Sequence, residues 1–358
     1  MVIIIEPALK EIKITYFNNK NPLSSGNLIL TGVEESEVPN ELLKILEHPD
    51  GKERIDAICF KIAFGGDIFS SPAKIDKEFL KKFLQLIDFS PLYISFILRL
   101  LKAFVQSSKK IPLIAFFDTS FFNCLPKTKK YYSLPWDIQK KNNIKKYGFH
   151  GLYHKANSDL VKKQVKLISI ILDKQSTVCA IKNNKPYSIS LGRTPLEGIM
   201  SQTSCGDVDL GMILFLMKNH GFSLYQIDQI LKNESGFLGI TGYNLSVAEL
   251  TPLYGKDKKI TLAFKIYESQ ILKYIGEALS ILEGIDEIIF SGSYTKDLTQ
   301  IIYNLVKQMS FMGITLSETP WDTKETKTII TAKDSKVKVT INRTNLSQII
   351  FNELKRTV

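Results

Sequence analysis

The segment KKYGFHGLYHK, residues 145–155, places two of the four histidines of the chain beside two glycines. Gly148 and Gly151 flank His150, which predicts a tight turn followed by a helix. His150 and His154 are four residues apart, so they can share one face of that helix. Three interpretations stay open: a histidine that faces an anion, a structural histidine at a turn, and a metal-binding pair. The metal-binding pair lacks a third ligand at a recognisable spacing.

A second informative segment, IPLIAFFDTSFF, contains a carboxylate. Its β-branched and aromatic run stops at Asp118, and Thr119 follows. A carboxylate at the carboxyl end of a strand in an α/β sheet is well placed for catalysis or for contact with magnesium. The alternative is an aspartate that caps the next turn.

Two further segments, LGRTPLEGIMSQTSCGDVDLG (residues 191–211) and SGFLGITG (residues 235–242), combine glycine with serine or threonine. Such segments could cradle a phosphate group through backbone N–H groups. Neither contains a Walker A motif, and each alone is a weak indication.

Short apolar runs rich in β-branched residues alternate with helical patterns along the chain, which predicts the elements that would position these residues. Strands are expected at Val2–Ile5, Lys13–Phe17, Ile55–Ile62, Pro112–Phe117, Lys166–Leu172, Thr177–Ile181, Glu287–Ser291, Lys327–Thr331 and Val337–Ile341. Helices are expected at Lys77–Leu86, Tyr153–Lys163, Val208–Lys218, Tyr267–Glu283, Lys296–Met312 and Leu346–Lys355, with a surface loop at Glu318–Glu325. The apolar stretch Leu92–Val105 is too short and too charged to span a bilayer, so we expect a buried or interfacial helix there. Two groups of strands, each followed by helices, predict an α/β protein with two similar lobes.

The bulk composition agrees with a globular protein that has two domains. The chain has 358 residues and 44% hydrophobic residues. Its net charge of +11 favours a partner that is an anion. The lysines are spread along the chain, however, which is more typical of solvated faces than of a basic surface that binds nucleic acid. The four cysteines share no CxxC or zinc-type spacing, so we expect buried free thiols in a reducing cytoplasm. The apolar N-terminus is typical of a strand rather than a signal peptide, and no membrane association is expected.

Taken together and in order, FDTSFF, YGFHGLYH, TPLEGIM, GDVDLG and SGFLGITG resemble the motifs of the acetate kinase family. FKIAFGGDIF and DSKVKV also fit, so the resemblance covers nearly the whole chain. It implies the two-lobed actin-like ATPase fold with ribonuclease H-like lobes and a central nucleotide cleft. The lobes would be residues 1–120 plus 346–358 and residues 121–345. It also implies phosphoryl transfer between ATP and acetate, with Mg²⁺, in a cytoplasmic homodimer.

The same resemblance assigns the site residues. Asp118 and His150 match the catalytic aspartate and the phosphate-stabilising histidine, and would face one cleft. The substrate side would contain Lys61, Tyr93 and Ser204, where the family has arginine, histidine and arginine. Residues expected on the nucleotide side are Gly236, Gly239, Gly242, Ser246 and Ser293. No residue is assigned as a metal ligand.

The chain departs from the family pattern mainly where phosphate would be held. Glu6 stands in place of an asparagine, and Asp173 and Gln175 replace both glycines of the phosphate loop. An added carboxylate repels polyphosphate, and side chains at glycine positions obstruct a close approach to the backbone. Leu346 replaces the first glutamate of a magnesium-linked TNEE motif, and Lys61 lacks the fork of an arginine. The loss of one preorganised hydrogen-bond donor typically lowers the catalytic rate about 100- to 1000-fold. We therefore expect an acetate kinase homologue with weak or lost activity that binds ATP weakly or not at all.

Three alternatives remain. The first is an active carboxylate kinase with a rebuilt phosphate site, in which Lys61, Lys174 and Lys296 substitute for lost contacts. The second is a non-catalytic binding or scaffold protein that acts through the dimer surface of the family. The third is an anion- or nucleic-acid-binding protein, which a clustered positive face would favour.

Overall fold

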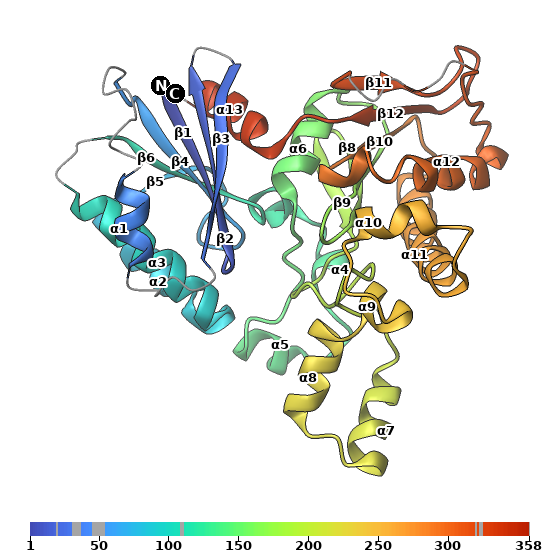
Figure 1. Ribbon diagram of the computed structural model, residues 1–358, viewed down its shortest axis with the longest axis horizontal. Helices are drawn as coiled ribbons and strands as arrows, with labels where there is room; N and C mark the ends of the chain where they lie inside the picture. Colours follow the sequence, from blue (N-terminus) through green and yellow to red (C-terminus); the bar gives the residue numbers. More distant parts are fainter. Residues whose placement is uncertain are drawn as a thin grey trace. The chain divides into compact units, whose positions relative to one another are not determined.

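The computed structural model describes residues 1–18, 21–30, 37–44, 54–107, 111–318, 321 and 325–357. The chain divides into two compact units, which Figure 1 shows with the chain coloured from blue to red. The first unit is formed by Met1–Asn123 and Asn345–Val358, and the second by Cys124–Thr344. Each unit contains one six-stranded sheet together with helices. The expected α/β class is therefore confirmed.

The sheet of the first unit has the strand order β3-β2-β1-β4-β6-β5. Its strands are β1 (Val2–Pro7), β2 (Glu11–Asn18), β3 (Asn21–Ile29), β4 (Ala57–Ile62), β5 (Ala73–Lys74) and β6 (Leu113–Phe117). The three strands β1, β4 and β6 are parallel to one another. Their near-continuous apolar sequences are typical of strands that are covered on both faces. Because their carboxyl ends share one edge, residues just after these strands are brought close together.

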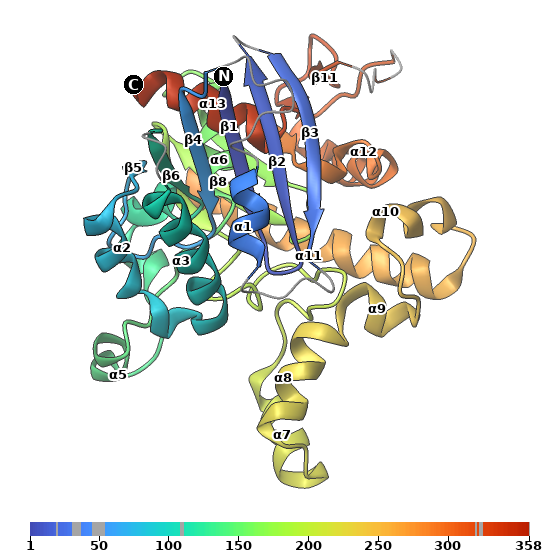
Figure 2. The ribbon, with the colours of Figure 1, turned by 60° about the vertical axis from the view of Figure 1, so that its left-hand side comes forward.

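The helices of the first unit are α1 (Val38–Leu43), α2 (Lys77–Leu84), α3 (Pro91–Gln106) and α13 (Leu346–Thr357). Figure 2 shows α1, α2 and α3 grouped together and α13 beside β1. Helix α3 starts at Pro91, which suits the first helical position, and it contains the expected buried or interfacial helix at Leu92–Val105. Helix α13 joins the same core, because Phe351 stacks on Phe17 with ring centroids 4.5 Å apart.

The sheet of the second unit has the order β11-β12-β10-β7-β8-β9. Its strands are β7 (Leu167–Ile171), β8 (Thr177–Lys182), β9 (Lys185–Ile189), β10 (Glu287–Ser291), β11 (Lys327–Ile329) and β12 (Lys338–Asn342). Strands β7, β10 and β12 are parallel, whereas β8 and β9 form an antiparallel hairpin beside them.

The helices of the second unit pack on this sheet or extend from it. They are α4 (Lys127–Lys130), α5 (Trp136–Lys141), α6 (Gly151–Asp159), α7 (Leu210–His220), α8 (Leu224–Asn233), α9 (Gly236–Thr241), α10 (Val247–Leu250), α11 (Lys258–Leu282) and α12 (Thr299–Gln308). The long helix α11 starts at the cap residue Asp257 and buries one face in the core of the unit. Helices α7 and α8 project away from the sheet of the unit (Figures 1 and 2). In the part of the chain that the structure describes, no helix is long and apolar enough to cross a membrane.

Each predicted strand overlaps an observed one, but the observed strands β3, β5 and β9 were not predicted. Strand β3, NPLSSGNLI, is mostly exposed and contains polar residues and glycine, so it carries no apolar alternation. Helix α11 starts at Lys258 rather than Tyr267, and the segment 235–242 contains helix α9. The expected loop Glu318–Glu325 lies mostly outside the described residues.

The cysteine prediction is only partly right. Cys59 and Cys179 are buried free thiols, but Cys124 is exposed and Cys205 is partly exposed. Neither Cys124 nor Cys205 lies in a strand, so neither follows the apolar pattern that places Cys59 and Cys179 inside the sheets.

We expect Ile271→Ala to lower the free energy of unfolding by about 2–5 kcal/mol, because Ile271 is fully buried against the second sheet on α11. Leu262→Ala removes the same number of carbon atoms from an exposed site on the same helix, so its effect should stay within about 0.5 kcal/mol. Chemical denaturation of both variants gives the comparison. Equal losses would contradict the burial of this face of α11.

Candidate functional site

The first unit contains a buried ion pair at the carboxyl ends of two parallel strands. Lys61 lies near the end of β4, and Asp118 follows β6 directly. The Nζ atom of Lys61 lies 2.6 Å from Oδ2 of Asp118, whose side chain is 3% exposed. Burial lowers the pKa of Lys61, but the Asp118 carboxylate outweighs burial, and that pKa is raised overall. Lys61 therefore stays positively charged, and Asp118 pairs with it rather than capping the next turn.

Tyr93 of α3 lies against the same pair. Its hydroxyl oxygen accepts a hydrogen bond from the backbone N–H of Ala63, with a donor–acceptor distance of 2.8 Å. Burial raises the pKa of Tyr93, while Lys61 acts in the opposite direction. The structure thus brings together three of the predicted site residues, Lys61, Tyr93 and Asp118.

The residues of this unit do not fit a magnesium site. Lys61 already holds Oδ2 of Asp118, and Leu346 offers no oxygen ligand. The Oδ1 atom of Asp118 is buried and has no hydrogen-bond partner among the described residues. Within those residues, no group of three or more histidine, cysteine or acidic side chains is arranged to hold a metal ion.

Glu6 is also engaged within the first unit. Ser347 of α13 donates a hydrogen bond of 2.5 Å to Oε1 of Glu6, and Nζ of Lys13 lies 3.3 Å from the same oxygen. The Ser347 hydroxyl lies 3.0 Å from that of Thr15. The carboxylate that replaces the expected asparagine therefore links β1 to α13 and β2.

In the second unit, His150 immediately precedes α6 and adopts the left-handed conformation, with φ of 60°. Its Nδ1 atom lies 3.2 Å from the hydroxyl oxygen of Thr177, and Nε2 of the fully buried His154 lies 3.0 Å from the same oxygen. Burial, with a smaller contribution from His150, holds the pKa of His154 well below its usual range. His154 is thus a neutral core residue, and Thr177 joins it to His150.

The loop that begins at Asp173 is filled by its own side chains. Nε2 of Gln175 donates a hydrogen bond of 2.7 Å to the carbonyl oxygen of Ile199, and the Ser204 hydroxyl donates to Oε1 of Gln175 over 3.3 Å. Oδ1 of Asp173 accepts a hydrogen bond of 2.9 Å from Ser293. Gln175, which replaces an expected glycine, therefore contacts Ser204, which replaces an expected arginine, while Asp173 contacts Ser293.

The two glycine-rich segments pack side by side. The backbone N–H of Phe237 donates to the carbonyl of Ser201 over 3.0 Å, and that of Leu238 donates to Gln202 over 2.9 Å. A Cβ atom at Gly236, where φ is +63°, would lie 2.1 Å from the Ser201 oxygen, so only glycine fits. The structure brings Gly236 close to Ser204, and the amides of Phe237 and Leu238 are occupied rather than open to phosphate.

The other residues expected on the nucleotide side have clear local roles. A Cβ atom at Gly239 would lie 2.6 Å from the carbonyl oxygen of Glu234. Gly242 ends α9 in the left-handed conformation, and Ser246 starts α10 in a capping box with Glu249.

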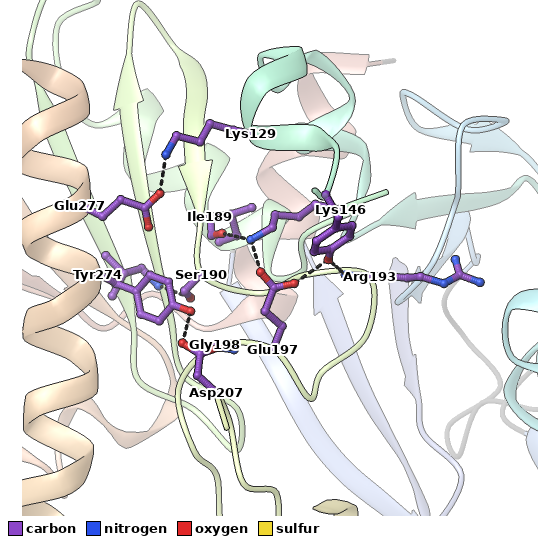
Figure 3. A network of polar contacts seen from close by, with 12 residues as sticks. Lys129, Lys146, Ile189, Ser190, Arg193, Glu197, Gly198, Asp207, Tyr274 and Glu277 are labelled. Carbon is purple, nitrogen blue, oxygen red and sulfur yellow. Dashed lines mark hydrogen bonds and ion pairs between the residues drawn. The ribbon is translucent and has the colours of Figure 1, made fainter. Parts of the chain in front are cut away.

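The glutamate of the TPLEG motif is held in a polar network (Figure 3). Glu197 accepts hydrogen bonds of 2.5 Å from both Lys146 and Tyr132. A Cβ atom at Gly192 would lie 1.7 Å from Oε2 of Glu197, so the close approach requires glycine. Burial and then Glu197 raise the pKa of Tyr132, which keeps the phenol protonated as a donor.

The first aspartate of GDVDLG closes a neighbouring loop. Asp207 accepts a hydrogen bond of 2.8 Å from the N–H of Gly198 and one of 2.6 Å from Tyr274 on α11 (Figure 3). It also accepts a bond of 2.6 Å from Lys273 of the same helix. The second, Asp209, is the cap residue of α7. The acidic residues of both motifs therefore stabilise loops of the second unit.

Sequence reasoning missed Thr177, Tyr132 and Lys146 as contributors to these networks. Their partners are distant along the chain: Glu197 lies 65 residues after Tyr132 and 51 after Lys146. No local spacing could have indicated them, whereas the FDT and GFHG motifs marked Asp118 and His150 directly.

Comparisons with known proteins cover nearly the whole chain. The sequence profile of the Acetokinase family matches residues 15–352. The acetate kinase of Clostridium novyi is 32% identical over 315 residues, which is 86% of this chain and 78% of that protein. The acetate kinase of Caldicellulosiruptor saccharolyticus is also 32% identical, over 88% of this chain and 83% of that protein.

Solved structures agree. The crystal structure of Porphyromonas gingivalis acetate kinase matches with a TM-score of 0.89 and 25% identity, covering 99% of this chain and 98% of that chain. A propionate kinase from Francisella tularensis matches with a TM-score of 0.85 and 24% identity over 98% of each chain, which bears on the fold alone. The expected actin-like ATPase fold of acetate kinases is thereby confirmed. A profile match over most of the length, together with relatives above 30% identity, means that this chain belongs to the Acetokinase family.

Proposed function

We propose that this protein is an acetate kinase homologue whose phosphoryl transfer between ATP and acetate is weak or lost. The observation that carries the proposal is the contact between Gln175 and Ser204 in the second unit. Both residues stand where the family pattern has phosphate-binding groups. The Ser204 hydroxyl donates to Oε1 of Gln175, and Nε2 of Gln175 donates to the Ile199 carbonyl oxygen. The loop is thus closed by neutral side chains.

The electrostatics of the first unit support the same proposal. Phosphoryl transfer depends almost wholly on positioning and on stabilising the charge of the transferred group. Lys61 is the cation that remains on the substrate side, and its ammonium is committed to Asp118 at 2.6 Å. An incoming phosphoryl group would have to compete with a buried carboxylate for it. Separating a buried pair leaves a charge uncompensated, which is costly.

In this proposal Asp118 and His150 act on one phosphoryl group, with acetate near Lys61, Tyr93 and Ser204. The adenosine side would be held by Gly236, Gly239, Gly242, Ser246 and Ser293. Any remaining activity would depend on His150 as a hydrogen-bond donor and on Lys61 as the cation.

A second candidate is an active carboxylate kinase with a rebuilt phosphate site. The charged state of Lys61 favours it, because the raised pKa of Lys61 keeps a cation where the family pattern has arginine. This candidate requires ATP to bind despite the filled loop, so the binding experiment below separates the two.

We also propose that the protein is a cytoplasmic homodimer that associates through the hairpin of α7 and α8. Helix α7 has the sequence LGMILFLMKNH and no buried residue. Leu214 and Phe215 are 53% and 51% exposed, and Leu224 of α8 is 74% exposed. An exposed apolar patch of this kind is typical of an interaction site. If catalysis is lost, this surface is also what would serve a binding or scaffold role.

We expect no magnesium-dependent ATP binding in the micromolar range, because Gln175 and Asp173 crowd and charge the loop. Isothermal titration calorimetry with MgATP measures this directly, with an active acetate kinase measured in parallel. The double variant Asp173→Gly with Gln175→Gly should bind on the order of tenfold more tightly, equivalent to ~1.4 kcal/mol. Micromolar affinity of the unmodified protein would reject the degenerate-site proposal in favour of the rebuilt site.

We expect acetyl phosphate formation far below the range of about 1–100 per second that is typical of kinases. Restoring single residues should recover little, because groups that act as a unit are non-additive. The sharper variant combines Lys61→Arg, Ser204→Arg and Leu346→Glu with Gln175→Gly, since Gln175 otherwise holds residue 204. Trapping acetyl phosphate with hydroxylamine gives the rate, and Leu262→Arg controls for added charge. A typical rate in the unmodified protein would overturn the proposal.

We expect Leu214→Glu with Phe215→Glu to convert the dimer to monomer at micromolar concentration, since each copy would place two charges in an apolar interface. Phe311→Glu, at an 80% exposed site elsewhere in the second unit, should leave the dimer intact. Sedimentation velocity distinguishes the species. A monomeric unmodified protein, or a dimer that survives the double change, would exclude this interface.

A further inference from the structure

A chain of hydrogen-bonded polar side chains runs through the second unit from Thr344 to His150. Between these ends it passes through five buried residues: Asn342, Asn157, Ser169, His154 and Thr177. They come from β12, α6, β7 and β8, so they join one helix to three strands. Hydroxyls, amides and imidazoles can both donate and accept hydrogen bonds. The direction of the bonds along the chain must therefore be assigned from an end group that can only donate.

The backbone N–H of Thr344 is that end, because a backbone N–H can only donate. It donates to Oδ1 of Asn342 over 3.2 Å, and the Thr344 hydroxyl donates to the same oxygen over 2.7 Å. The Asn342 amide nitrogen must then donate to Oδ1 of Asn157, at 3.0 Å, where Ser291 also donates over 2.8 Å. Asn157 therefore presents its amide nitrogen to Oγ of Ser169, at 2.9 Å.

Ser169 transmits this direction to His154. Its oxygen accepts from Asn157 and lies 2.8 Å from Nδ1 of His154, and no other polar contact of this hydroxyl occurs among the described residues. If His154 donated from Nδ1, the Ser169 hydrogen would be buried without an acceptor, which is unfavourable. Ser169 must therefore donate to Nδ1, and a neutral His154 then carries its proton on Nε2. The lowered pKa of His154 agrees with the neutral form.

The last hydrogen bonds of the chain join His154 through Thr177 to His150, the histidine of the YGFHG motif. Nε2–H of His154 donates to Oγ1 of Thr177 over 3.0 Å, so the Thr177 hydrogen points to Nδ1 of His150 over 3.2 Å. We propose that Thr177 and His154 are positioning residues that hold His150 in the tautomer with its proton on Nε2.

The tautomer decides how His150 meets an anion. With the proton on Nε2, the ring atom that is not bound to Thr177 is a donor and attracts a phosphoryl oxygen. With the proton on Nδ1, the same ring atom would present a lone pair and repel it. This use of the N–H rests on the proposed function, but the tautomer itself does not. It can therefore be measured without nucleotide or acetate.

The test is the ¹⁵N NMR spectrum of the histidine rings at a pH where they are neutral. Protonated and unprotonated ring nitrogens have well-separated shifts, and His48→Gln and His220→Gln variants simplify the assignment. We expect Nδ1 unprotonated and Nε2 protonated in both His150 and His154. The preferred form of His150 should exceed the other by about tenfold or more, given the cost of a buried unpaired hydrogen. A proton on Nδ1 of His154 would overturn the direction of the chain.

Two variants of Thr177 separate positioning from mere packing. Thr177→Ser keeps the hydroxyl and should leave the His150 tautomer unchanged. Thr177→Val keeps the shape but loses the hydroxyl, so His150 should exchange between tautomers and its Nδ1 and Nε2 shifts should move toward each other. His154 keeps its bond from Ser169 in both variants, so its unchanged Nδ1 shift reports an intact fold, whereas its Nε2 shift should move in Thr177→Val because that N–H loses its acceptor. A folded Thr177→Val protein with wild-type His150 shifts would refute the positioning role. A kinase rate of about 1–100 per second, found while these shifts hold, would count against the proposed function alone.

Discussion

The buried amide of Asn157 constrains how one helix of the second unit packs against three of its strands. It is fully buried on α6 and meets Ser169 of β7, Ser291 of β10 and Asn342 of β12. A buried amide without partners is costly, so these three parallel strands must hold their relative positions for α6 to dock. The placement of His150 immediately before that helix follows from the same bonds.

A related constraint operates in the first unit, where charge rather than an amide must be satisfied. Lys61 and Asp118 neutralise each other in a site from which water is largely excluded. A buried pair of this kind adds little net stability, but the removal of either partner is expensive. The two units therefore share one property: the polar groups at the motif residues are largely satisfied from within the chain.

The sequence predicted the parts of the fold that leave a local pattern. The apolar runs of β1, β4 and β7 are visible because buried parallel strands are continuously apolar. Strand β3 was missed because its exposed polar sequence has no such pattern. Asp118 and His150 could be singled out from motif and spacing, although their roles stay predictions. The bond between Gln175 and Ser204 could not, because it depends on how two distant loops fold onto each other.

The Gln175–Ser204 contact also couples the substitutions that positions 175 and 204 can accept. Glycine at position 175 alone would leave the Ser204 hydroxyl with Ser201, 2.7 Å away, as its partner, and arginine at position 204 alone would meet the Gln175 side chain in a nearly buried position. Residues in contact have coupled effects, so the two changes made together are not expected to have the sum of their separate effects. In such a pair, the effect of a substitution at one position depends on which residue occupies the other, so neither position has a tolerance to change that can be measured alone.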